Sequence, residues 1–183
     1  MTQPALKRDI GDTILAVDNI SLSFGGVKAL QNISFSVNEH EVFAIIGPNG
    51  AGKSSMLNCI NGFYHPQEGT ITFKGETRRQ VRPSVAARTG IARTFQNIAL
   101  FKGMSTLDNI MTGRNTKMST NIFLQALHFG PAAKEEVEHR EVVERVIDFL
   151  EIEAIRKTPV GKLPYGMQKR VELGRALAAE PDL

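Results

Sequence analysis

The feature that most constrains this chain is the segment Gly47-Pro48-Asn49-Gly50-Ala51-Gly52-Lys53-Ser54, which matches the pattern GxxxxGK[ST]. It follows the apolar run 42–46 and precedes a stretch with helical apolar spacing, so we expect it to join a buried strand to a helix. Glycines at 47, 50 and 52 permit backbone angles closed to residues with a Cβ, and they let successive N–H groups converge on a polyphosphate. The sequence therefore predicts a phosphate-binding loop.

Two side chains at the end of this loop add the chemistry that a nucleoside triphosphate requires. Lys53 supplies a positive charge for the β- and γ-phosphates, and the Ser54 hydroxyl can ligate a Mg²⁺ ion that the phosphates hold. The start of the following helix contributes a partial positive charge. The candidate nucleotide site thus comprises Gly47, Pro48, Asn49, Gly50, Ala51, Gly52, Lys53, Ser54 and Ser55.

Composition excludes several other classes. The chain has 183 residues, of which 42% are apolar and 22% are charged, as in an ordinary globular protein. It contains no apolar run of the roughly 18 residues that span a bilayer and no apolar segment typical of a signal peptide, so we expect a cytoplasmic protein. Its one cysteine, Cys59, predicts a small buried side chain. The net charge of +3 is spread along the chain, and no nucleic-acid partner is expected.

Hydrophobic patterning predicts an α/β fold. We expect residues 1–13 to form a flexible tail and strands to lie over 14–24, 29–37, 42–46, 69–75 and 91–94. The helix after the phosphate loop carries Met56, Leu57 and Ile60 on one face and ends near Gly62, and a short helix starts at Pro83. From Thr106 onward the pattern is helical, with segments opening at Thr106, over 121–129, up to Leu150 and over 166–179.

The helix ending at Leu150 is expected to be amphipathic. Val143, Val146, Ile147 and Leu150 share one face, and the charged residues around them predict a solvated opposite face.

Two further segments resemble motifs of one family. Leu163-Pro164-Tyr165-Gly166-Met167-Gln168, followed by Lys169-Arg170-Val171-Glu172, resembles the signature segment of ATP-binding cassette (ABC) proteins, and Arg93-Thr94-Phe95-Gln96 resembles their glutamine loop. The resemblance covers residues 14–183. It implies a P-loop NTPase of ABC ATPase type, with an antiparallel β layer, a helical subdomain over about 97–179, and the carboxy-terminal part of the core missing. It also implies an ATP-hydrolysing enzyme.

The resemblance implies roles for individual residues. Phe24 matches the aromatic that stacks on adenine, Gln96 senses the γ-phosphate and contacts Mg²⁺ together with Ser54, and Leu163, Pro164, Tyr165, Gly166, Met167 and Gln168 contact ATP held by an opposite subunit. A core position for Phe24 is the alternative. The apolar segment 97–104 would face a membrane subunit, or else form an ordinary surface loop.

The local sequences around Phe24, Phe95 and Tyr165 are similar to those of the ATP-binding subunits of bacterial branched-chain amino acid importers. That similarity implies uptake of branched-chain amino acids or a related polar solute. The implied partners are transmembrane permease subunits, a second ATP-binding subunit and, indirectly, a periplasmic solute-binding protein. The location would be the cytoplasmic face of the inner membrane.

The chain also departs from the family pattern. Pro164 stands where the usual signature has a serine that donates to the γ-phosphate, and Met167 replaces a glutamine. The family's Mg²⁺-holding aspartate, water-activating glutamate and switch histidine would follow Leu183. We therefore expect residues 1–183 alone to bind ATP without useful hydrolysis.

Two other functions use the same loop. A non-transport ABC ATPase acting on nucleic acid or ribosomes would carry tandem cassettes or a basic arm, and neither is present in these 183 residues. A small-molecule kinase or GTPase needs no signature helix, and a GTPase needs an Asn-Lys-x-Asp segment that this sequence lacks.

Overall fold

A computed structural model describes residues 10–118 and 131–183 of the chain. These residues divide into two compact units, one within Met1–Ala86 and the other within Ala87–Leu183. Each unit has its own architecture and is described by itself. The helix expected over 121–129 lies outside the described residues.

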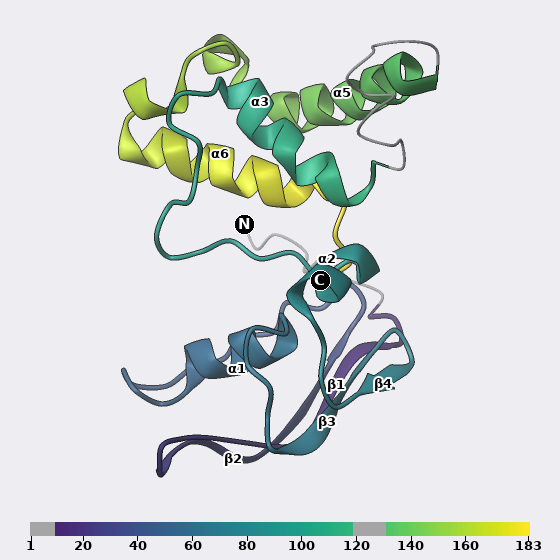
Figure 1. The fold of residues 1–183 in the computed structure, drawn as a ribbon, viewed down its shortest axis with the longest axis vertical. Coiled ribbons are helices and arrows are strands. Elements are labelled where there is room, and N and C mark those ends of the chain that lie inside the picture. The colour runs from purple at the N-terminus through teal and green to yellow at the C-terminus, as the bar shows by residue number, and fades with distance from the viewer. Residues whose placement is uncertain (1–9, 119–130) are drawn as a thin grey trace, which may run out of the picture. The chain divides into compact units, whose positions relative to one another are not determined.

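The first unit is built on an antiparallel sheet of four strands in the order β2-β1-β3-β4 (Figure 1). The strands are β1 (Thr13–Phe24), β2 (Val27–Asn38), β3 (Glu68–Phe73) and β4 (Glu76–Arg78). This confirms the antiparallel layer expected from the sequence, and β4 is an addition. It arises because Lys74 and Gly75 both have positive φ and turn the chain back, so that Ile71 pairs with Arg78.

The burial pattern of β1 shifts by one residue along the strand. Leu15 and Val17 are buried, as expected for alternation, but the next buried pair is Ile20 and Leu22. The register with β2 is irregular between Val17 and Ile20, where Asn19 has a φ of 52°. A bulge of this kind inserts a residue and lets both halves of the strand direct apolar side chains to the same face.

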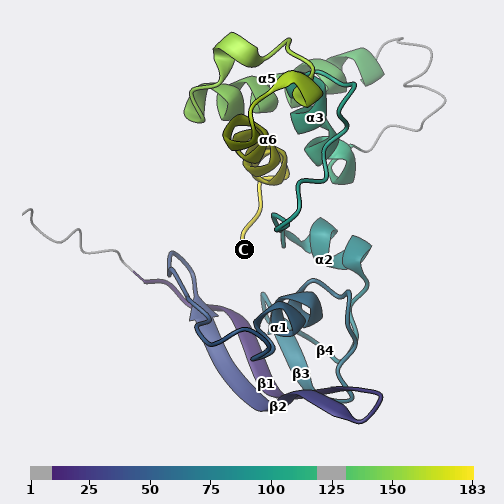
Figure 2. The ribbon, with the colours of Figure 1, turned by 90° about the vertical axis from the view of Figure 1, so that its left-hand side faces the viewer.

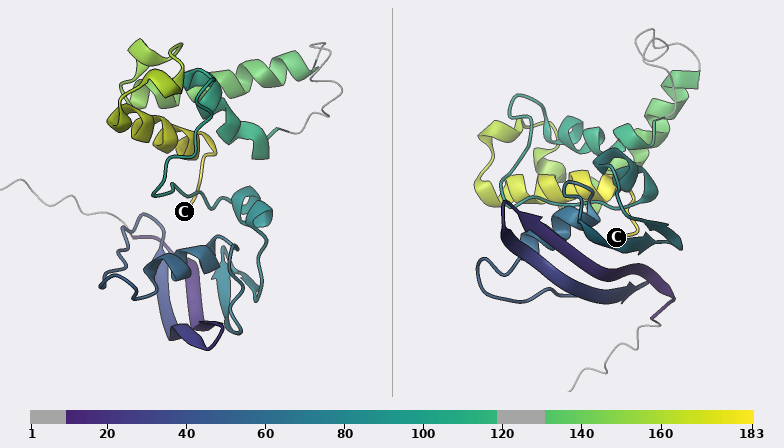
Figure 3. Two further views of the ribbon diagram at one scale, coloured as in Figure 1. Left: turned by 60° about the vertical axis from the view of Figure 1, so that its left-hand side comes forward. Right: turned by 60° about the horizontal axis from the view of Figure 1, so that its bottom comes forward.

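Helix α1 (Lys53–Ile60) lies over one face of this sheet (Figures 2 and 3). Its buried side chains are Met56, Cys59 and Ile60, whereas Leu57 is 41% exposed, so the expected apolar face is displaced by part of a turn. Burial raises the pKa of the Cys59 thiol to about 11. A thiol in this environment stays protonated at neutral pH, which agrees with a packing role for Cys59.

The strand expected over 42–46 is wrong. These residues have no strand assignment, and Val42 and Ile46 are 80% and 91% exposed. The apolar run indicates burial, but a buried strand also needs a neighbouring strand for its N–H and C=O groups. Within residues 10–118 and 131–183 the sheet contains no such partner for it.

The second unit is helical. It contains α3 (Thr106–Met111), α5 (Pro131–Phe149) and α6 (Tyr165–Ala178), with short 3₁₀ turns η1 (Thr112–Thr116), η2 (Glu153–Ile155) and η3 (Val160–Lys162). Helix α2 (Pro83–Thr89) is confirmed at the end of the first unit and the beginning of the second. Helix α3 starts where expected, capped by Ser105, whose side chain accepts from the Asp108 N–H.

One apolar cluster holds α3, α5 and α6 together. Val143 and Ile147 of α5 are fully buried and Val146 and Leu150 pack beside them, which confirms the expected apolar face. The rest of the cluster consists of Leu107, Ile110, Ile152, Val160, Leu163, Val171 and Ala178.

The strand expected over 91–94 is not present either. Instead, the backbone of this stretch bonds to the last residues of the sequence: the Ala92 N–H donates to Leu183 O, and the Asp182 N–H donates to Gly90 O. These bonds satisfy the backbone without forming a ladder. Among the described residues, no helix combines the length and apolar character needed to cross a bilayer.

Candidate functional site

The phosphate loop joins segment 42–46 to α1. Gly50 and Gly52 have φ values of 85° and 83°, in the left-handed region that favours glycine. At Gly52 a Cβ would also lie 2.5 Å from Ala29 O, so the loop packs directly against the backbone of β2. Gly47 is different from the expectation, because its φ is not positive. A Cβ there would lie 3.2 Å from the Ala51 Cβ, and close packing is what limits this position.

The first turn of α1 presents unpaired N–H groups at the end of the loop. The first backbone bond of the helix runs from the Met56 N–H to Gly52 O, at 2.9 Å. The N–H groups of Lys53, Ser54 and Ser55 therefore precede the helical ladder and are available to an anion at this terminus. Ser54 is exposed, and no acidic side chain occurs in this first turn. This chemistry matches a polyphosphate ligand.

The Lys53 side chain folds back over the loop. Its Nζ donates to Gly47 O at 2.7 Å and to Pro48 O at 2.6 Å. These bonds place the ammonium group beside the loop backbone and hold the loop in its curved form. The ammonium group of Lys53 would therefore lie close to a phosphate bound in the loop.

An apolar cavity of about 300 Å³ adjoins the loop. Its walls come from β2 and residues 43–46, with Phe35 and Phe43 stacked at a centroid distance of 4.9 Å. Among the described residues that line it, Lys53 is the charged one. An apolar lining cannot replace the hydration of a triphosphate, so the phosphate chemistry belongs to the loop and the helix terminus.

Phe24 lies at the end of β1, and its ring is 44% exposed. The ring is therefore not a core side chain. It contacts the Tyr64 ring edge-on, with centroids 5.0 Å apart and an interplanar angle of 72°. Because the ring is exposed, its stacking on a base stays a prediction.

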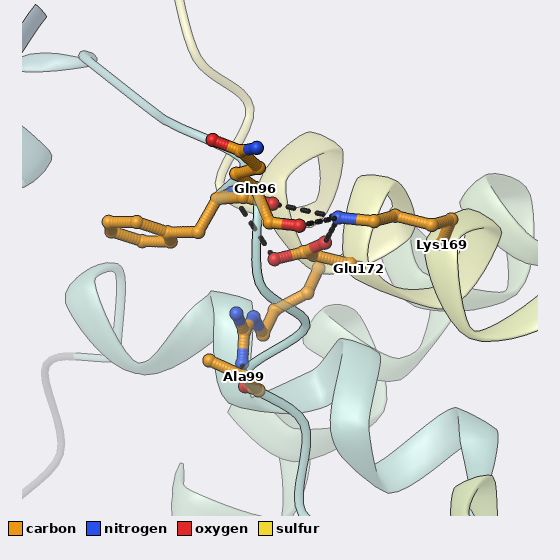
Figure 4. A network of polar contacts seen from close by, with 6 residues as sticks. Gln96, Ala99, Lys169 and Glu172 are labelled. Carbon is orange, nitrogen blue, oxygen red and sulfur yellow. Dashed lines mark hydrogen bonds and ion pairs between the residues drawn. The ribbon is translucent and has the colours of Figure 1, made fainter. Parts of the chain in front are cut away.

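Gln96 lies in the second unit, on the segment that precedes α3. Its side chain is exposed, and its backbone carbonyl accepts from Lys169 Nζ at 3.0 Å. The Gln96 amide group points away from Lys169 and Glu172 (Figure 4). Because Gln96 and Ser54 belong to different units, a Mg²⁺ ion shared between them stays a prediction.

A buried carboxylate fixes the backbone beside Gln96. Glu172 on α6 is 1% exposed; its Oε1 accepts from the Phe95 N–H at 3.2 Å and its Oε2 from Lys169 Nζ at 2.9 Å (Figure 4). Lys169 also donates to Phe95 O, and Arg175 donates to Ala99 O. The glutamine-loop segment is thus attached to α6 by three side chains, Lys169, Glu172 and Arg175, which span about two turns of that helix.

The signature segment forms the start of α6. Leu163 is buried in the helical core, while Pro164 occupies the N-cap position and makes no side-chain bond there. Tyr165 is 66% exposed and Gly166 is also exposed, with open space where a Cβ would be. Met167 is partly buried, and Gln168 Nε2 donates to Leu163 O. Pro164, Tyr165 and Gly166 are therefore the exposed members of the signature segment, whereas Leu163 is buried and Met167 and Gln168 are partly buried.

The segment 97–104 has an exposed apolar tip. Phe101 is 56% exposed, and the loop around it is held by Asn109, which is fully buried. Asn109 Oδ1 accepts from the Phe101 N–H, and its Nδ2 donates to Phe101 O, Met104 O and Ser105 O. One buried amide therefore fixes the shape of this loop.

Three residues of the site region were not identified from the sequence: Tyr64, Gln67 and Glu172. Glu172 sits in a helix at a position that apolar periodicity would fill with a hydrophobic residue, which is the one signal that could have found it. Tyr64 and Gln67 lie in the connection between α1 and β3, where no periodicity applies.

Within the described residues, no group of three or more His, Cys, Asp or Glu side chains is arranged to hold a metal ion.

Comparison with known proteins identifies the family of this chain. Residues 30–183 match the family model described as ABC transporter. The chain is 36% identical over 171 residues to the high-affinity branched-chain amino acid transport ATP-binding protein BraF of Pseudomonas aeruginosa, which covers 92% of this chain and 66% of that protein. It is 35% identical to the probable branched-chain amino acid transport ATP-binding protein LivG of Methanocaldococcus jannaschii, over 93% of this chain and 65% of that one.

Solved structures give the same result. A nucleotide-free ATP-binding cassette from an ABC transporter is 36% identical with a TM-score of 0.75, and an ADP conformation of an ATP-binding cassette is 35% identical with a TM-score of 0.76. Each covers 92% of this chain, which in turn spans 66% of each of those chains. Both the expected fold class and the resemblance to branched-chain amino acid transport ATPases are thereby confirmed. This chain belongs to the ABC transporter family, and it spans about two thirds of the length of its curated relatives.

Proposed function

We propose that this chain binds Mg-ATP as the nucleotide-binding part of an ABC importer subunit. The observation that carries the proposal is the phosphate loop itself: Gly50 and Gly52 in left-handed conformation, free N–H groups at the start of α1, and Lys53 folded over the loop. The triphosphate would replace the contacts of Lys53 with Gly47 O and Pro48 O. Ser54 would supply an oxygen to the Mg²⁺ ion, and Phe24 would stack on adenine.

The names of the relatives support the proposed solute class. Several of them are named as ATP-binding proteins of branched-chain amino acid transport. We propose the same solute class, or a related polar solute, for the transporter to which this chain contributes, with uptake as the direction. The chain would act at the cytoplasmic face of the inner membrane with permease subunits, a second ATP-binding subunit and, indirectly, a periplasmic solute-binding protein.

The second unit provides the surfaces for these partners. The exposed start of α6 at Tyr165 and Gly166 would contact ATP bound to the second subunit, and the Phe101 loop would contact a permease. Gln96 would respond to the γ-phosphate and Mg²⁺, and its attachment to α6 would carry that response to the signature segment. Residues 97–179 would move together as a helical subdomain.

The test of nucleotide binding is the substitution Lys53→Ala. It removes the charge at the phosphates and leaves the backbone of the loop, so a loss of about 1.5–3 kcal/mol, or roughly 10- to 150-fold in affinity, is expected. Titration of a fluorescent ATP analogue with Mg²⁺ measures it. Lys157→Ala, which removes an exposed lysine of the helical unit, is the matched control. Equal affinities for wild type and Lys53→Ala would contradict the proposal.

Turnover is a separate part of the proposal. Binding the triphosphate requires only the loop, whereas its hydrolysis also requires a group that orients water and a complete Mg²⁺ shell. We propose that residues 1–183, purified alone, release phosphate no faster than buffer. Turnover abolished by Lys53→Ala would show instead that these residues contain the whole catalytic machinery.

A further inference from the structure

The two residues proposed to contact opposite ends of a nucleotide, Phe24 and Lys53, are joined through one short segment. This segment, residues 61–67, follows α1 and precedes β3. We call it the 61–67 connector. It contacts the last turn of α1 at one end and the end of β1 at the other, and all of these contacts lie within the first unit.

The connector is fixed to α1 by a glycine turn. Gly62 has a φ of 76°, its N–H donates to Cys59 O, and a Cβ on it would lie 2.3 Å from Val81 O. The next two N–H groups, of Phe63 and Tyr64, both donate to Asn58 O, at 2.8 and 3.1 Å. These bonds close the carbonyls at the end of α1, so the backbone of Tyr64 keeps a set position relative to the phosphate-loop helix.

At its other end the connector extends the β ladder by means of a side chain. The pairing of β1 with β3 ends at Ser21 and Glu68, and the Gln67 N–H donates to Ser21 O. Beyond that point the Gln67 amide takes the place of a strand: Oε1 accepts from the Ser23 N–H at 2.9 Å, and Nε2 donates to Ser23 O at 3.1 Å. Both backbone groups of the residue before Phe24 are therefore held.

The Tyr64 ring then holds the side chain of Phe24. The two rings meet edge-on at 5.0 Å and 72°, an arrangement that aromatic pairs prefer, and it leaves the Phe24 ring 44% exposed. Without the neighbouring ring, an exposed phenylalanine at a strand end can adopt other rotamers. With it, the ring orientation is set by the connector.

We propose that Tyr64 and Gln67 are positioning residues for the base of the bound nucleotide. Gln67 holds the backbone of Ser23, Tyr64 holds the ring of Phe24, and the connector fixes both to α1, whose first turn faces the phosphates. The inference rests on the proposed binding of ATP at Lys53 and Phe24. It makes the affinity for the base depend on residues that need not contact the nucleotide.

The experiment compares a ligand that has a base with one that has none. Residues 1–183 and variants are titrated with Mg-ATP and with Mg-tripolyphosphate by calorimetry. Tyr64→Leu is expected to lower the affinity for Mg-ATP about three- to tenfold, the scale of one aromatic pair, and to leave the affinity for Mg-tripolyphosphate unchanged. Tyr64→Phe keeps the ring and should bind both ligands as wild type does. Gln67→Leu, of similar size but without the two hydrogen bonds, should act in the same direction as Tyr64→Leu.

The Phe24→Ala background separates positioning from direct contact. If Tyr64 acts through Phe24, Tyr64→Leu has no further effect on ATP affinity once Phe24 is alanine. An unchanged ATP affinity in Tyr64→Leu overturns the proposal, and so does an equal loss for ATP and tripolyphosphate, which would show general damage to the loop. Failure of the proposed function gives a different pattern, in which wild type binds neither ligand or Phe24→Ala loses no ATP affinity.

Discussion

The buried carboxylate of Glu172 accepts a hydrogen bond of 3.2 Å from the backbone N–H of Phe95, and Lys169 Nζ lies 2.9 Å from the other carboxylate oxygen. This contact attaches the glutamine-loop segment to α6 from inside the helical unit. A buried carboxylate is tolerated here because both of its oxygens have donors. The position of the Gln96 backbone therefore depends on a residue of the signature helix.

We first predict that Glu172→Leu destabilises the chain by about 1–3 kcal/mol, because the Phe95 N–H loses the acceptor that the buried carboxylate provides. Lys169 is one-third exposed, so its charge remains solvated, and the loss stays below that of a fully buried ion pair. Urea unfolding measures the change. Glu144→Leu, which breaks the more exposed ion pair with Arg156, is the control and should cost less than about 1 kcal/mol. Similar losses for both variants would contradict the role of burial.

A second prediction compares two glycines with nearly the same backbone angle. Gly62 and Gly75 have φ values of 76° and 78°, but a Cβ would contact Val81 O only at Gly62, and Gly75 has open space. Gly75→Ala should therefore lower the free energy of unfolding by about 1–2 kcal/mol, the strain of a left-handed residue with a Cβ. Gly62→Ala should cost about 1–3 kcal/mol more, the scale of overpacking. Chemical denaturation of both variants measures the difference, and equal stabilities would show that the backbone at Gly62 relaxes freely.

The third prediction concerns the departure from the usual signature sequence. Pro164 is the N-cap of α6 with φ −58° and ψ 152°, angles that a serine adopts without strain, and proline provides no side-chain acceptor there. Pro164→Ser should be more stable than Pro164→Ala by about 0.5–2 kcal/mol, because both variants lose the rigidity of proline but only serine can accept from the first-turn N–H groups. The midpoints of thermal unfolding of the two variants measure this difference in stability. Equal midpoints would mean that the cap is not formed.

A fourth prediction concerns pH. The hydrogen bond from Arg114 to Glu180, 2.6 Å long, together with the Arg114 charge, lowers the pKa of the Glu180 carboxyl below its ordinary value of 4.5, against the opposite effect of partial burial. A lowered pKa in the folded state means that ionised Glu180 stabilises the fold above about pH 4.5. This contribution is lost as the pH falls through the lower folded value.

The variant that checks this is Glu180→Gln. Because the Glu180 side chain is half exposed, the variant should lose less than about 1 kcal/mol near pH 7, and the difference from wild type should shrink as the pH falls below about 4.5. Urea unfolding over this range measures it, with Glu153→Gln at an exposed position as the control. A difference that grows at acid pH would reverse the assigned sign.

The sequence by itself determined the parts of this protein that depend on short-range chemistry. The loop from Gly47 to Ser54 combines glycines with a lysine and a serine in the pattern of a phosphate-binding loop. The helix starts expected at Pro83 and Thr106 were confirmed, because they depend on residues at the helix start itself. The apolar face of α5 followed from its periodicity for the same reason.

Only the tertiary structure decided what depends on distant neighbours. The run 42–46 is apolar enough for a buried strand, but a strand forms only where another strand supplies hydrogen bonds, and the described sheet supplies none there. Likewise, nothing local indicates that Glu172 reaches Phe95 or that Tyr64 meets Phe24, because both pairs join segments far apart in the chain. Periodicity and capping depend on residues that are close in the sequence. The acceptor of the Phe95 N–H and the orientation of the exposed Phe24 ring depend instead on packing between elements that are distant in the sequence.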